Sequence, residues 1–119
     1  MPELLQPSRV PVPGGKLIEE LVGRSSSGHN NYSVAHMSAP PGWDEPAQTP
    51  TFDEITYVIS GEVVVEGAGG PFHVGAGQAI LTRAGEQVRY AVGPEGADYL
   101  ALCVPAFSPE AAHREDGQP

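Results

Sequence analysis

The sequence has 119 residues and a mass of 12.4 kDa, which suits one compact domain and leaves no room for a second core. Its 15 Asp and Glu residues against 6 Lys and Arg give a formal charge of -9, which repels phosphate backbones and anionic lipid. We therefore expect neither nucleic acid nor a membrane among its partners. The lack of a long apolar run and of a basic N-terminal region predicts a cytoplasmic location.

The chain opens with a segment that Pro and Gly interrupt repeatedly. Residues 1–15 are therefore predicted to form an extended N-terminal arm, of the kind that lies across a neighbour. Residues 16–22 can form a strand or a short helical turn, and we favour the strand. A polar loop rich in Ser and Gly follows at residues 23–31.

The middle of the chain, residues 32–104, consists of short β-like runs bounded by Gly or Pro, which predicts a sandwich or small barrel. Residues 60–62 and 67–71 are predicted hairpin turns, because Gly supplies the positive φ that tight connections need. In the tail, residues 105–119, Ser108 before Pro109 predicts one helical turn. The predicted strands are residues 32–38, 54–60, 62–66, 72–74, 78–83, 87–92 and 99–104.

Two stretches anchored by glycine resemble the paired motifs of the cupin superfamily. In the first, Gly42 is followed at matching places by Gln48, Pro50, Glu54 and Gly61. Cupins that bind a metal have His-x-His where this chain has Gln48 and Pro50. Of the ligands in the first motif, the chain keeps Glu54 alone.

The second motif is matched by Gly77, Arg83, Gly85 and Val88, with Val88 in place of the last histidine. The resemblance implies an all-β fold, the cupin-type double-stranded β-helix or jelly-roll barrel, over a single domain of residues 1–119. Because three of the four usual ligands are missing, we expect no metal and no other cofactor at the usual site.

Two shorter stretches are similar to particular cupins. Residues 53–55 and 61–62, with the strand end at 104–106, resemble ethanolamine-utilisation cupins of the Q type, which also lack the metal histidines. Residues 105–110 and 113–116 resemble the last segment of ectoine synthase-like cupins. The second resemblance implies cyclase or dehydratase chemistry. The tail at residues 113–116 can fold over a barrel opening or remain frayed, and we favour the ordered tail.

Strand alternation identifies the candidate catalytic residues. Glu54 lies on one predicted strand, and Val88 and Tyr90 lie on another. If Glu54 and Val88 both point into the barrel, alternation turns Tyr90 inward as well, so the carboxyl and the phenol become neighbours. A carboxyl enclosed by apolar side chains has a raised pKa and suits proton transfer near neutral pH. The predicted catalytic residues are Glu54, Tyr90 and His36, although Glu54 can equally serve as a hydrogen-bonded wall residue.

The same alternation, with two loop residues, gives the candidate substrate-binding residues. Gln48 can orient a carbonyl or hydroxyl group through its amide, and Trp43 can cover the mouth of the barrel. An unorthodox metal site of His36, Glu54 and Glu45 stays open as an alternative. The predicted substrate-binding residues are Gln48, Trp43, Thr56, Val58 and Val88.

These observations predict a homodimeric, metal-independent enzyme that transfers protons to a small organic substrate in the barrel interior. An isomerase, cyclase, dehydratase or lyase fits, because each needs a positioned acid or base in a dry pocket. The alternatives are a ligand-binding or accessory cupin without catalysis, and a cupin that holds a metal with an unorthodox ligand set.

Overall fold

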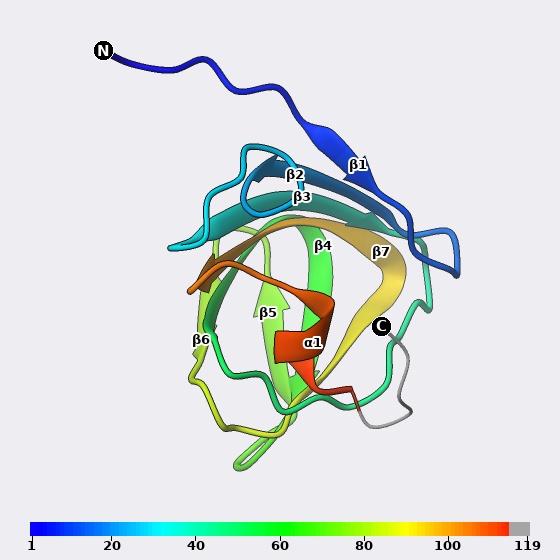
Figure 1. Ribbon diagram of the computed structural model, residues 1–119. Helices are drawn as coiled ribbons and strands as arrows, with labels where there is room; N and C mark the ends of the chain where they lie inside the picture. Colours follow the sequence, from blue (N-terminus) through cyan, green and yellow to red (C-terminus); the bar gives the residue numbers. More distant parts are fainter. Residues whose placement is uncertain (115–119) are drawn as a thin grey trace.

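The computed structural model describes residues 1–114, which form seven strands and one short helix. The strands are joined in one antiparallel sheet of order β1-β2-β3-β7-β4-β5, with β6 paired to β4, and the sheet curls into a barrel (Figure 1). This confirms the predicted all-β barrel. Within these residues, no helix is long and apolar enough to cross a membrane. The elements are β1 (Ser8–Val10), β2 (Leu17–Val22), β3 (Ser33–Ala39), β4 (Asp53–Glu66), β5 (Phe72–Gly75), β6 (Ala79–Thr82), β7 (Arg89–Val104) and α1 (Pro109–Ala112).

Two long strands, β4 and β7, form the spine of the barrel and correct the predicted strand ends. The predicted hairpin at 60–62 is wrong, because β4 runs on through Gly61 with register shifts on both sides of it. Gly61 has φ of +79°, and the carbonyl oxygen of Gly96 on β7 would lie 2.1 Å from a Cβ at this position. Glycine here bends two paired strands rather than reversing the chain. Likewise, the predicted strands 87–92 and 99–104 are the two ends of β7.

The second predicted hairpin, at 67–71, is confirmed by the antiparallel pairing of β4 with β5. Gly70 N donates to Gly67 O over 3.1 Å to close this turn. The predicted helical turn is α1, where Ala111 N donates to the N-cap oxygen Ser108 Oγ over 3.2 Å.

The N-terminal segment matches the predicted arm only in part. Residues 1–7 are exposed, belong to no strand and lead away from the barrel (Figure 1). β1 pairs with β2 through Arg9 and Glu19, and β2 pairs with β3, so residues 8–22 widen the sheet ahead of residue 32. The strand favoured for 16–22 is thereby confirmed as β2. Backbone hydrogen bonds hold β1 on its own barrel, which explains why residues 8–10 belong to the sheet and not to the arm. The homodimer stays a prediction.

The core lies in two clusters. The larger one packs side chains from β3, β4, β5 and β7 between the two halves of the barrel, and Trp43 packs against it. The smaller one joins Phe52, Cys103 and Ala112 and fixes α1 near one end of the barrel, with Phe107 against it. The space between the two clusters is not filled, and it forms the cavity described next.

Candidate functional site

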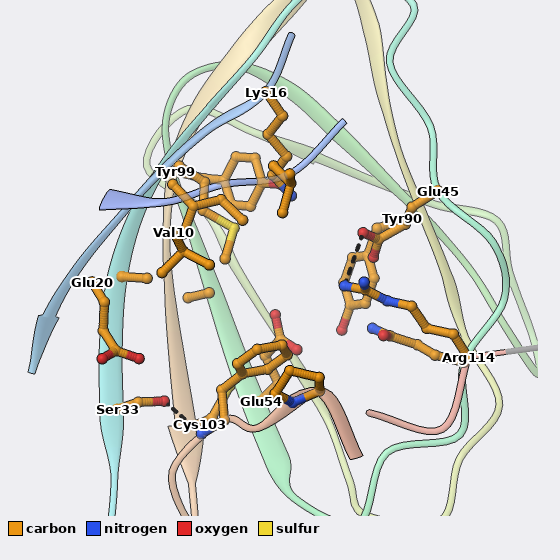
Figure 2. Close-up of a pocket in the computed structure, with 18 of the residues that line it drawn as sticks. Val10, Lys16, Glu20, Ser33, Glu45, Glu54, Tyr90, Tyr99, Cys103 and Arg114 are labelled. Carbon is orange, nitrogen blue, oxygen red and sulfur yellow. Dashed lines mark hydrogen bonds and ion pairs between the residues drawn. The ribbon is translucent and has the colours of Figure 1, made fainter. Parts of the chain in front are cut away.

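A cavity of about 220 Å³ lies inside the barrel. Its wall is mainly apolar, but five acidic or basic side chains, Lys16, Glu20, Glu45, Glu54 and Arg114, reach it from separate parts of the chain (Figure 2). β1, β2, β3, β4 and β7 build its sides, and the tail supplies Phe107, Pro109 and Arg114. The tail up to Arg114 therefore borders the cavity, in line with the ordered tail that we favoured, while residues 115–119 lie outside the described residues.

Glu54 is the carboxyl that the predicted alternation placed inside the barrel, and its burial confirms that placement. It lies on β4 between Thr82 of β6 and Cys103 of β7, and Thr56 Oγ1 donates to its Oε2 over 3.4 Å. Burial raises the pKa of Glu54 to about 7, and the charge of Glu45 adds to this. Lys16 and hydrogen bonds from Thr56 and Tyr90 lower it in part. Such a carboxyl both gives and takes a proton near neutral pH.

Tyr90 is the predicted neighbour of Glu54, and it too lines the cavity from β7. Its Oη and Thr82 Oγ1 are hydrogen-bonded at 3.0 Å, which fixes the ring between β6 and β7. Burial, followed by the charge of Glu54, raises the pKa of Tyr90, so the phenol stays protonated. Tyr90 is thus a hydrogen-bond donor beside the carboxyl.

Lys16, just before β2, lines the cavity, and the sequence analysis gave it no role. It is the only lysine of the chain, and it is 7% exposed. Its Nζ lies 3.9 Å from the ring centroid of Trp43 and 5.2 Å from that of Tyr99. Burial lowers the pKa of Lys16 to about 8, although Glu45 and Glu54 oppose this. The sequence held one signal for it, a lone lysine at the start of an apolar strand.

Glu45 and Arg114 form a second pair on the wall, with Arg114 Nη2 and Glu45 Oε2 3.8 Å apart. Both side chains are mostly buried, and burial raises the pKa of Glu45, while Lys16 and Arg114 lower it. The sequence reasoning named Glu45 only as a metal ligand and gave Arg114 no role. This ion pair forms only because the C-terminal tail folds back against the barrel, beside the loop that precedes β4.

Gln48 reaches the cavity as predicted. Its backbone forms an antiparallel bridge with Val88, in which Gln48 N donates to Val88 O over 2.8 Å. The Gln48 residue is 4% exposed, and its Oε1 is a buried acceptor without a hydrogen-bond partner. A buried acceptor of this kind costs free energy unless a ligand or water supplies a donor.

The other predicted substrate-binding residues do not form the cavity wall. Val58 and Val88 are buried in the larger core cluster, where apolar side chains pack against one another. Thr56 supports Glu54 through its hydroxyl. Trp43 packs against the larger core cluster and its ring contacts the Lys16 ammonium, and it is not among the residues that line the cavity. These positions correct the predictions for Val58, Val88, Thr56 and Trp43 as residues of the cavity wall.

The predicted catalytic role of His36 is corrected by its position. Its neighbours on β3, Ala35 and Met37, line the cavity, so strand alternation turns His36 to the outer face. The side chain is 37% exposed there and lies 3.6 Å from Asp98 and 4.0 Å from Glu19. His36 therefore cannot join Glu54 and Glu45 in a metal site.

The residues present do not fit the metal site of cupins. At the four matching positions, Gln48 and Glu54 reach the cavity, Val88 lies in the core, and Pro50 offers no side-chain donor. Across residues 1–114, no group of three or more His, Cys, Asp and Glu side chains is arranged to hold a metal ion.

Comparison with known proteins places the chain in a family. The family model described as the AraC-like ligand binding domain matches residues 30–118. A curated relative, Endoribonuclease YbeY from Myxococcus xanthus, is 44% identical over 111 residues, which cover 92% of this chain. The chain spans 38% of the length of that relative.

Solved structures agree in fold. A variant of Pac13 from Streptomyces, solved with uridine, has a TM-score of 0.70 at 16% identity, over 88% of this chain and 80% of that one. An RmlC-like cupin from Shewanella frigidimarina has a TM-score of 0.67 at 17% identity, over 87% of each chain. The family match and this shared architecture identify the chain as a member of the AraC-like ligand binding domain family with a cupin fold.

Proposed function

We propose that this protein binds a small organic molecule in the barrel cavity and transfers a proton to or from it through Glu54. The observation that carries this proposal is the position of Glu54, whose buried carboxyl lies on the cavity wall beside the Tyr90 phenol. A ligand in the cavity lies against both groups. Tyr90 would then hold an oxygen of the ligand while Glu54 moves the proton.

The environment of Glu54 suits this work. A carboxyl with a pKa of about 7 is present in both protonation states at neutral pH, so little free energy is needed to reach either state. A positioned acid or base of this kind contributes roughly a hundred- to ten-thousand-fold in rate. Isomerisation, cyclisation, dehydration and elimination all need such a group. Pac13 is described as a nucleoside dehydratase, which supports a dehydratase among these classes at the level of fold alone.

The test begins with a ligand found by an NMR screen of small metabolites against the purified protein. Wild type, Glu54→Gln and Glu62→Gln are then compared for binding and for deuterium uptake from D₂O into the ligand. Glu62 lies on the same strand with its side chain 41% exposed, so its variant is a matched control. We expect Glu54→Gln to bind the ligand and lose exchange, and Glu62→Gln to keep both. Exchange that persists in Glu54→Gln rejects the proposal.

A second candidate is ligand binding without chemistry, and the description of the family as a ligand-binding domain favours it. In that case Glu54 and Tyr90 hold the ligand, which is released unchanged. The same experiment separates the two, because a pure binding protein shows no exchange in wild type and binds less tightly in Glu54→Gln.

The curated relative bears the name of an endoribonuclease, but the chain spans 38% of that protein. A net charge of -9 opposes an RNA backbone. We therefore propose that the part of the relative that this chain resembles serves ligand binding and not RNA cleavage. Incubation of this protein with RNA should leave the RNA intact.

A further inference from the structure

We infer that the cavity takes a small hydroxycarboxylate with a single negative charge, and that the Lys16 ammonium is the counter-charge of its carboxylate. This inference rests on the proposed function for the presence of a ligand in the cavity. It does not depend on proton transfer by Glu54.

The first argument is the state of Lys16. Its side chain lies on the cavity wall near Tyr99 (Figure 2), and its ammonium lies 3.9 Å from the ring centroid of Trp43 and 5.2 Å from that of Tyr99. Among residues 1–114, no carboxylate lies within 4.0 Å of it, although His36, His73, Arg89 and Arg114 all have such partners. A buried ammonium is costly without a negative partner, and ring faces offset that cost only in part. Glu45 and Glu54 act on the ammonium only from beyond 4.0 Å, and an anion in the cavity would be its direct partner.

The second argument is the charge balance of the wall. Arg114 is already engaged by Glu45, so these two charges cancel. Glu20 also lines the cavity, and its Oε2 accepts hydrogen bonds from Ser25 N and Ser26 N, which compensate its charge. Lys16 and Glu54 remain, and Glu54 is uncharged when it holds its proton. Lys16 then carries the positive charge on the wall that no direct partner among the described residues balances, inside a protein whose formal charge is -9. One negative charge on a ligand is therefore matched, while a second would lie near Glu45 without a partner.

The third argument concerns the rest of the ligand. Most of the wall is apolar, so the carboxylate must belong to a molecule with a hydrocarbon part. The cavity volume of about 220 Å³ restricts that part to a small size. The apolar residues that line it include Val10, Val12, Ile18, Met37, Tyr99 and Phe107.

The fourth argument adds a hydroxyl group. Gln48 Oε1 is buried and lacks a hydrogen-bond partner, and its side chain lines the same cavity. An acceptor in this state is satisfied by a donor from a ligand or water. A ligand hydroxyl supplies one, and it also suits Tyr90 and Glu54, which donate and accept hydrogen bonds on the wall of the same cavity.

The experiment is isothermal titration calorimetry with lactate, 3-hydroxybutyrate and 4-hydroxybutyrate, each paired with its neutral primary amide. It is run below the pKa values of Glu54 and Lys16, so that the carboxyl is neutral and the ammonium charged. We expect at least one carboxylate to bind about tenfold or more tightly than its amide. Lys16→Met should abolish the preference and Lys16→Arg should retain it. Arg9→Met is the matched control, because Arg9 is an exposed cation on β1.

Equal binding of carboxylate and amide overturns the inference, as does an unchanged preference in Lys16→Met or no binding of any of the three carboxylates. If Lys16→Met does not fold, the comparison of carboxylate with amide in wild type and in Lys16→Arg decides. Deuterium exchange, which the proposed function expects Glu54→Gln to lose, is measured separately from carboxylate binding. The inference and the proposed function can therefore fail independently. Carboxylate binding without proton exchange in wild type supports the inference and rejects the function, whereas exchange on a neutral ligand does the reverse.

Discussion

The Nζ atom of Lys16 lies 3.9 Å from the ring centroid of Trp43, and this contact joins the start of β2 to the loop before β4. A cation over an indole face gains electrostatic attraction that strengthens when water is excluded. The sequence has one lysine and one tryptophan. All tryptophan fluorescence therefore comes from Trp43, and Lys16 is the only lysine that can affect it.

The first prediction uses this pair. The fluorescence of Trp43 should change with a midpoint near pH 8, because burial lowers the pKa of Lys16 to about 8 and the cation leaves the ring on deprotonation. The measurement is a fluorescence titration of wild type and Lys16→Met. The transition should disappear in Lys16→Met, and a transition that survives there would assign it to another group.

The second prediction concerns stability and Glu54. The folded pKa of about 7 lies above the ordinary 4.5, so the proton stabilises the folded state. This contribution is fully present below pH 4.5 and is lost as the pH rises through 7. It amounts to on the order of 3 kcal/mol. Urea unfolding across this range should show the loss in wild type and Glu62→Gln and not in Glu54→Gln, while parallel curves for all three proteins contradict the assignment.

The third prediction tests the bend in β4. Gly61→Ala should lower the free energy of unfolding by roughly 2 to 5 kcal/mol, because it combines a positive φ with an overlap on Gly96. Gly77 has a similar φ of +83° but nothing within 4 Å of an added Cβ. Gly77→Ala should therefore cost about 1 to 2 kcal/mol. Chemical denaturation measures both, and equal losses would mean that the contact with β7 is unimportant.

The fourth prediction concerns the cap of α1. Ser108→Ala removes the acceptor of Ala111 N and should cost about 1 kcal/mol of stability. Ser25→Ala, at an exposed loop serine, is the control and should change stability little. Thermal unfolding compares the two variants with wild type. Identical melting temperatures for Ser108→Ala and wild type would show that the cap is not needed.

The fifth prediction concerns His36. Because this side chain lies on the outer face beside Asp98 and Glu19, His36→Gln should leave ligand binding in the cavity unchanged. Calorimetry with any ligand that wild type binds is the measurement. A loss of affinity comparable to that of Lys16→Met would place His36 in the site after all.

Much of the site was predictable because strand alternation is local. Once Glu54 points inward, the period of two places Thr56 and Val58 on the same face, and their burial confirms this. The glycine-anchored motifs likewise indicated the fold and the loss of metal ligands. What alternation cannot give is its phase on an isolated strand, and His36 shows the consequence. Its position one residue from two cavity-lining neighbours turns it outward.

By itself, then, the sequence determined the all-β barrel, the inward carboxyl of Glu54 beside Tyr90, the turn at 67–71 and the cap at Ser108, since each depends on neighbours within a few residues or on motif spacing. The tertiary structure alone decided that Lys16 faces Trp43, that Arg114 meets Glu45, and that Gly61 bends a strand instead of ending it. These contacts join segments far apart in the chain. Their formation depends on how the whole sheet closes, which no local pattern encodes.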